Sequence, residues 1–222
     1  MAEHQNNSRR TALKRVVVIG GAVALPAGML APAVARAAEA APGSGAFQAQ
    51  HTLSASEASI LEAIVARLIP SDESGPGAKE ARAADYIDRS LAGALAGSRK
   101  AYAAGLAAVD AYAQSSKSAT FVSLSPADQD ALLTAMQKNA ATGFTPNSAA
   151  FFYLVLNHTL QGTFCDPFYG GNANFVGWDM IGYPGIRMAV APEEQRLGVK
   201  VKPHRESAYS SAMSLKGGSR GH

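Results

Sequence analysis

Apolar residues recur at helical spacing along most of this chain, and no run alternates apolar and polar residues as a half-buried β-strand would. The clearest helix is predicted to begin at Ser54, because Glu57 follows three residues later with the spacing of a capping box. The apolar positions that follow on one face, before Pro70 ends the run, are Ile60, Leu61, Ile64, Val65 and Leu68. This face must pack against other elements.

Four further helices are predicted downstream, each with an apolar face. Ser125 as N-cap, with Pro126 at the first helical position, marks the start of one of them. The apolar markers of the four are, in chain order, Ile87, Leu91 and Leu95; Tyr102, Leu106 and Val109; Leu132, Leu133 and Met136; and the segment 147–160. The sequence therefore predicts an all-α fold, a compact bundle of about five helices in a small domain at 54–190.

Glycine and aromatic residues replace this pattern at 164–185. Six of the 16 aromatic residues lie here, interleaved with five glycines. Because glycine carries a large backbone entropy cost in a helix, we expect an irregular, ordered loop. Residues 191–222 lack an apolar period, and we expect an extended polar tail that extends from the core or wraps a partner.

The first 37 residues are predicted to be a cleavable export signal, followed by a linker at 38–53. Paired arginines before a modest apolar segment, 16–30, are typical of the twin-arginine route for folded proteins, although Ala12 stands where that motif usually has Phe. The residues that carry the motif are Ser8, Arg9, Arg10, Leu13 and Lys14. The alternative is a retained anchor, but roughly 15 apolar residues containing Pro26 are fewer than the about 20 that a spanning helix needs.

The positive charge of the chain belongs largely to this signal. The whole sequence has a net charge of +3 and a pI of about 9.0. The first 37 residues hold five basic residues and one acid, so their removal leaves a net charge of −1. No nucleic-acid partner is therefore expected.

Cys165 is the only cysteine of the sequence. A single thiol excludes an intramolecular disulfide, a multi-cysteine iron–sulfur site and the two-cysteine haem attachment motif. In an exported protein such a cysteine either bonds to another chain or stays a buried thiol, and the sequence leaves both open.

Cofactor and catalytic motifs are not recognisable in the sequence. It has no dinucleotide-binding glycine motif after a strand, no phosphate loop and no paired-histidine zinc motif. The segment 217–221 spells the hydrolase pattern G-x-S-x-G but lacks the flanking strand and helix and the downstream Asp and His. We expect no catalytic residue, cofactor or metal in this chain.

Isolated polar residues fit structural roles better than chemical ones. Asp72 and a neighbouring glutamate are too few for a calcium site. Asp85 and Asp88 are interpreted as acids that favour the N-terminal end of a helix dipole. His158 has no second histidine nearby, so we expect it to be structural.

Two segments of the chain resemble the gluconate 2-dehydrogenase subunit 3 family. The first contains LIPSDE at 68–73, GPGA at 75–78, ADYIDR at 84–89 and LAG at 91–93. The second, and the more specific, is DPFYGGNANFVGWDMIGYPG at 166–185. The resemblance covers the chain from about residue 54 to residue 188. The twin-arginine leader, which precedes this range, agrees with it.

This resemblance implies a small subunit of a periplasmic, membrane-associated dehydrogenase complex. In the family, a large FAD-containing subunit of the GMC type oxidises a sugar, sugar acid or polyol, and a multihaem cytochrome c subunit passes the electrons to the membrane. The small subunit supports maturation and export, so the twin-arginine translocase is a further implied partner. FAD and haem c would then belong to the partners.

The second motif would be the docking surface for the large subunit. Aromatic residues offer large contact areas, and glycines let another backbone approach closely. The implied docking residues are Asp166, Pro167, Tyr169, Gly170, Gly171, Asn172, Gly177, Trp178, Ile181, Gly182, Tyr183, Pro184 and Gly185. Cys165 could form a disulfide with the large subunit in the oxidising periplasm. The alternative is a loop that packs only on its own bundle.

Two other functions remain open alternatives. A stand-alone periplasmic enzyme would use Asp72, His158 or Asp166 and would be active as a purified chain. A membrane-held structural protein would keep its N-terminus.

Overall fold

The computed structural model describes residues 52–187 and 189–209, all within the unit Gln50–His222. These residues contain six α-helices, α3 to α8, and five 3-10 helices, with no β-strand among them. The prediction of an all-α fold is confirmed. The predicted export signal, and all of the predicted linker except its last two residues, lie outside the described residues.

Helix α3, Ala55–Leu68, begins where its local sequence predicts. The Ser54 hydroxyl accepts a hydrogen bond from the Glu57 amide, and the Glu57 carboxylate accepts one from the Ser54 amide. Both bonds satisfy amides that a helix start leaves without intrahelical partners. The buried face comprises Ile60, Leu61, Ile64 and Val65.

Helix α4, Ala83–Leu91, is shorter than its apolar spacing predicts. The chain turns after Leu91, where the amides of Gly93 and Leu95 both donate to the Ser90 carbonyl. A short 3-10 helix, Ala96–Ser98, then leads into α5, Arg99–Lys117.

Helix α6, Pro126–Gln137, and helix α7, Ser148–Phe164, have polar N-caps. Ser125 accepts from the Asp128 amide, and Asn147 accepts from the Ala150 amide. A 3-10 helix, Phe121–Ser123, precedes α6 and buries Phe121.

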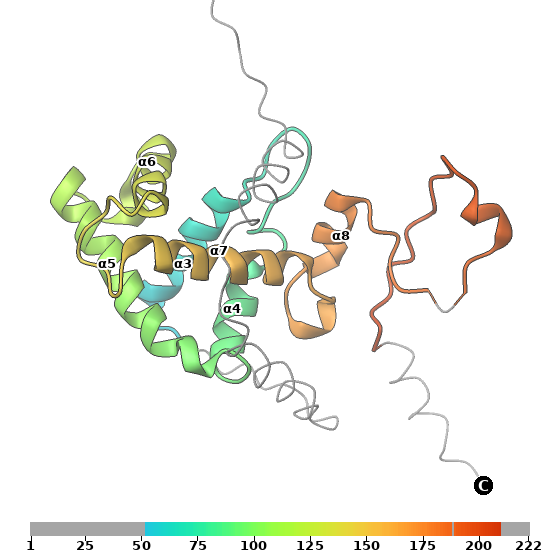
Figure 1. Cartoon of the computed structure of the whole chain (residues 1–222), viewed down its shortest axis with the longest axis horizontal. Coiled ribbons are helices and arrows are strands. Elements are labelled where there is room, and N and C mark those ends of the chain that lie inside the picture. The colour runs from blue at the N-terminus through green and yellow to red at the C-terminus, as the bar shows by residue number, and fades with distance from the viewer. Residues whose placement is uncertain (1–51, 188, 210–222) are drawn as a thin grey trace, which may run out of the picture. The chain divides into compact units, whose positions relative to one another are not determined.

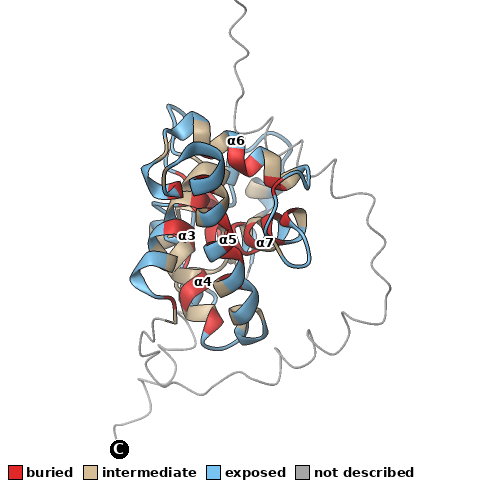
Figure 2. Cartoon of the chain, turned by 90° about the vertical axis from the view of Figure 1, so that its left-hand side faces the viewer, coloured by how far each residue is buried: buried red, intermediate tan, exposed pale blue. Residues whose placement is uncertain are grey.

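Helix α7 packs against α3, α4, α5 and α6 (Figure 1). Buried residues gather where these helices face one another (Figure 2). Gly105 allows α5 to approach α7, because a Cβ at this position would lie 2.2 Å from a ring carbon of Phe151. Tyr102, one turn earlier on α5, meets the same ring edge-on at a centroid distance of 5.9 Å.

The segment after α7 is more regular than predicted. It contains two 3-10 helices, Pro167–Tyr169 and Ala173–Phe175, and the short helix α8, Val176–Ile181. The expected irregular backbone is confined to the residues between and after these short helices, where four of the five glycines, all except Gly177, lie. Gly170 and Gly182 instead end helices with positive φ angles of 91° and 67°.

The described part of the tail is also not simply extended. A 3-10 helix, Pro192–Gln195, lies near its start. Arg187 holds this turn by donating to both carboxylate oxygens of Glu194 at 2.7 Å and to the Lys202 carbonyl at 2.6 Å. The chain beyond Lys202 then contacts the segment that follows α7.

Candidate docking surface

Asn172 closes the C-terminal end of α7 from inside the protein. Its amide donates to the Gly162 carbonyl at 2.7 Å, and its side-chain nitrogen donates to the Cys165 carbonyl at 2.8 Å. Its side-chain oxygen accepts from the Gly177 amide at 2.7 Å. Carbonyls at the end of a helix lack intrahelical partners, so this fully buried side chain completes α7 and ties α8 to it.

Gly171 and Gly177 lie against the backbone of the same helix end. A Cβ on Gly171 would lie 2.1 Å from the Gly162 carbonyl oxygen, and one on Gly177 would lie 1.8 Å from the Thr163 carbonyl oxygen. No side chain fits at either distance. The backbone that these two glycines approach therefore belongs to this chain.

Trp178 anchors α8. Its indole nitrogen donates to the Phe164 carbonyl at 3.0 Å, while its ring packs edge-on against Tyr183 at a centroid distance of 5.0 Å. The side chain is buried, so its ring removes apolar area from water. This burial stabilises α8 in addition to the hydrogen bond.

The two segments that carry the family resemblance meet beside this helix end. The Ala173 amide donates to the Ala81 carbonyl at 3.1 Å. Arg89 of α4 extends past Gly170, where a Cβ would lie 2.8 Å from a guanidinium nitrogen. Within the described part of the chain, the guanidinium of Arg89 has no hydrogen bond or ion pair, while the backbone carbonyl of this residue accepts a hydrogen bond from the Ala92 amide. The side chain is therefore an unpaired cation at this edge.

The predicted docking residues therefore divide into two groups. Gly171, Asn172, Gly177, Trp178 and Gly185 are buried. Tyr169, Ile181, Gly182 and Tyr183 are exposed, and Asp166, Pro167, Gly170 and Pro184 are half-buried. The first group packs inside this chain, and the second keeps exposed area.

Sequence reasoning did not select three residues of this surface: Phe168, Arg89 and Tyr209. Phe168 lies within the motif and is exposed, so its aromatic side chain could have been identified from the sequence as part of this surface. Arg89 lies in the first segment of the resemblance, but nothing in the sequence indicates that it reaches the second. Tyr209 lies 40 residues after Tyr169, yet their hydroxyls are 2.6 Å apart. This hydrogen bond is the main cause that raises the pKa of Tyr169 to about 12.

Cys165 ends α7 with a half-buried thiol. Burial is the main reason that the pKa of this thiol rises to about 11, which keeps the thiolate scarce at neutral pH. Its sulfur lies 3.7 Å from the Gly162 carbonyl oxygen. The thiol is therefore partly exposed and has one hydrogen-bond acceptor within its own chain.

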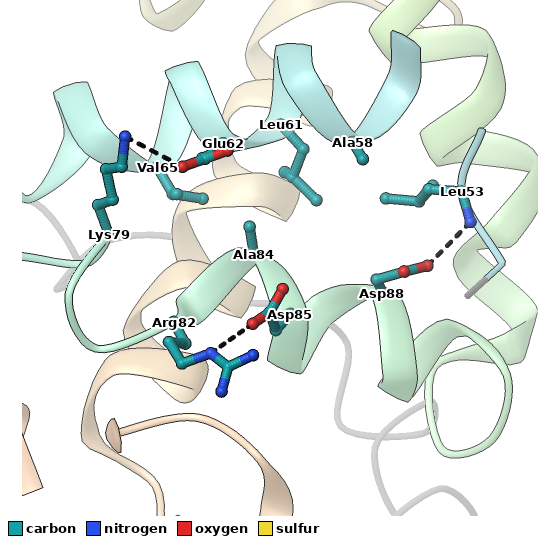
Figure 3. A pocket seen from close by; sticks show the side chains of 10 residues that line it. All are labelled: Leu53, Ala58, Leu61, Glu62, Val65, Lys79, Arg82, Ala84, Asp85 and Asp88. Carbon is teal, nitrogen blue, oxygen red and sulfur yellow. Dashed lines mark hydrogen bonds and ion pairs between the residues drawn. The ribbon is translucent and has the colours of Figure 1, made fainter. Parts of the chain in front are cut away.

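A groove of about 380 Å³ lies between α3 and α4 (Figure 3). Its charged lining residues all have partners: Lys79 pairs with Glu62 at 3.1 Å and Arg82 with Asp85 at 2.6 Å. The buried carboxylate of Asp88 accepts from the amides of Thr52 and Leu53, each at 2.8 Å. The groove thus has no free polar group that would orient a ligand.

The interpretation of Asp88 as a helix-dipole acid is therefore wrong. The side chain fixes the segment before α3 to α4, whereas Asp85, in the first turn of α4, fits the helix-dipole interpretation.

His158 is buried, and its Nδ1 lies 3.0 Å from the Tyr102 hydroxyl. Burial lowers the pKa of His158, so the ring is neutral at neutral pH and its Nδ1 can accept from Tyr102. The other residues considered for a stand-alone enzyme hold backbone amides: Asp72 accepts from the Ser74 amide, and Asp166 accepts from the amides of Phe168 and Ala208. Nothing in these contacts assembles a catalytic group.

Neither a metal site nor a membrane span is visible in the described residues. No three His, Cys, Asp or Glu side chains gather there as potential metal ligands. No helix in this part of the chain has the length and apolar character needed to cross a bilayer.

Fold and surface together define a small helical protein whose last core helix carries a folded aromatic surface. A family model described as gluconate 2-dehydrogenase subunit 3 matches residues 55–185, more than half of the chain. The chain belongs to this family of dehydrogenase subunits. A search of curated proteins and one of solved structures found no match.

Proposed function

We propose that this chain is a non-catalytic small subunit that assembles with, stabilises and exports the FAD-containing large subunit of a gluconate 2-dehydrogenase-like complex. The observation that supports the proposal is the convergence of both family segments on one exposed aromatic edge beside an unpaired arginine. Aromatic residues and arginine are enriched where protein interfaces gain most of their binding free energy.

Export through the twin-arginine route explains why a flavoprotein would need such a subunit. This route carries folded proteins, so a large subunit with FAD already bound can cross on the signal of its partner. The complex would then lie in the periplasm and pass electrons to a multihaem cytochrome c at the membrane. The substrate is proposed only as a class, a sugar, sugar acid or polyol.

The export role is tested by expressing the large subunit with this chain and measuring FAD-dependent dye reduction in the periplasm. Arg9→Lys combined with Arg10→Lys should abolish periplasmic activity, while Arg15→Lys, a matched change outside the pair, should leave it intact. Periplasmic activity that is unchanged by the double variant, or by omission of the chain, would show that the flavoprotein does not need this carrier.

A disulfide between Cys165 and a cysteine of the large subunit is part of the proposal. The two thiols would lose two protons and two electrons to the thiol-oxidising system of the periplasm. Since the thiol is half-buried, the segment around it would have to open before the bond forms. Non-reducing electrophoresis of the complex should show a covalent heterodimer that Cys165→Ser removes. Separate bands for the wild-type complex would contradict the bond without affecting the carrier role.

A further inference from the structure

The described end of the chain runs along the predicted docking segment. The His204 amide donates to the Pro184 carbonyl at 2.6 Å, and the Arg205 guanidinium pairs with Asp179 of α8 at 2.6 Å. Four residues later, Tyr209 reaches the first turn of the segment. We call residues 204–209 the strap.

Gly185 shows that the start of the strap is closely fitted. Its φ angle is +92°, and a Cβ there would lie 2.0 Å from the His204 carbonyl oxygen. The His204 ring nitrogen Nδ1 lies 2.9 Å from the Ile186 carbonyl oxygen. A side chain at 185 would push the strap away, so this glycine has a packing reason inside the chain.

The far end of the strap is held by Asp166 and by two aromatic rings. The Ala208 amide donates to the Asp166 carboxylate at 2.8 Å. The Tyr209 ring stacks on Phe168 at a centroid distance of 4.1 Å and an interplanar angle of 26°, and its hydroxyl bonds that of Tyr169. Asp166 therefore serves both the start of the 3-10 helix and the end of the strap.

The strap extends the aromatic surface instead of covering it. Phe168, Tyr169 and Tyr209 retain 38%, 48% and 37% of their accessible area. A segment that competed with a partner would bury these rings, whereas this one adds a third ring beside them. The contacts reach across 40 residues of sequence to make one continuous patch.

We propose that Phe168, Tyr169 and Tyr209, flanked by Arg89, form a composite docking site for the large subunit, and that the strap is a necessary part of it. The inference rests on the proposed function for its partner. Three exposed rings beside an unpaired guanidinium fit an apolar pocket on that subunit with a carboxylate at its rim.

The test is the affinity of the purified, FAD-loaded large subunit for variants of this chain. Tyr209→Ala, and a chain that ends at Pro203, should each weaken binding at least about tenfold, as expected for loss of a central aromatic contact. Tyr209→Phe should bind more tightly than Tyr209→Ala, because it keeps the ring. Tyr153→Ala is the matched control, since Tyr153 lies on α7 with a nearly equal exposed fraction of 38%.

The outcomes separate the two proposals. If wild-type chain fails to bind the large subunit, the proposed function fails. If wild type binds and both strap variants bind equally well, the composite site is wrong while the proposed function stands. Tighter binding by the truncated chain would also overturn the inference, because the strap would then be a competitor. Circular dichroism of each variant checks that the helical bundle is retained.

Discussion

Several residues of the segment after α7 that the sequence suggests as docking residues instead stabilise the fold of this chain. Asn172 illustrates this point, because a buried asparagine with partners on three sides would leave a carbonyl and an amide unsatisfied if truncated. Each such loss costs about 1–3 kcal/mol. The φ angle of Asn172, +45°, is also one that asparagine tolerates better than most residues.

Gly177→Ala should destabilise the protein by about 3 kcal/mol or more. The added methyl would lie 1.8 Å from the Thr163 carbonyl oxygen, a backbone atom that cannot yield without moving α7 or α8. Urea unfolding followed by circular dichroism measures the change. Gly93→Ala is the control, since nothing lies within 4 Å of a Cβ there and the free energy of unfolding should hardly change. Equal effects of the two substitutions would refute the close packing of α8.

His158 should make the stability depend on pH. Burial lowers its pKa in the folded state below the ordinary 6.5, so the unfolded chain takes up a proton first as the pH falls. The contribution of neutral His158 to the free energy of unfolding is complete above pH 6.5. It decreases below that pH, at no more than about 1.4 kcal/mol per pH unit. The free energy of unfolding, measured at pH 7.5 and 5.5, should fall less in His158→Asn than in wild type. Parallel pH profiles would contradict this assignment.

At the scale of elements, the sequence predicted well the features that depend on near neighbours. It predicted poorly the features that depend on contacts between distant residues. The caps at Ser54 and Ser125 and the apolar face of α3 depend on neighbours within four residues, so the sequence reveals them. Helix α8 was missed because its stability comes from Trp178 and its contact with α7, which outweigh the glycine content of the segment. Tyr209 was missed because its partners lie 40 residues away.

Asp88 joins two elements and gives a prediction at this scale. Asp88→Ala should release the segment before α3 from α4, because the amides of Thr52 and Leu53 lose their acceptor. We expect a loss of about 2 kcal/mol in the free energy of unfolding. Faster hydrogen exchange at Leu53 would locate the effect. Asp85→Ala, which breaks an exposed pair with Arg82, is the control and should cost under about 1 kcal/mol. Unchanged exchange at Leu53 in Asp88→Ala would count against the attachment.

At the scale of the whole molecule, the proposed function requires the bundle to present one surface to its partner. Helix α7 is fixed by four other helices, its end is sealed by Asn172, and the sealed end carries the exposed rings. A rigid support of this kind lowers the entropy cost of binding, because the surface is ordered before the partner arrives. The strap adds to this order.

The most direct test of the central claim is native mass spectrometry of the complex purified from the periplasm. We predict a heteromeric particle in which this subunit weighs less than the 22.9 kDa of the full chain, because its signal has been removed, and in which FAD stays with the large subunit on dissociation. A chain of full mass, or one recovered without a flavoprotein, would contradict the account.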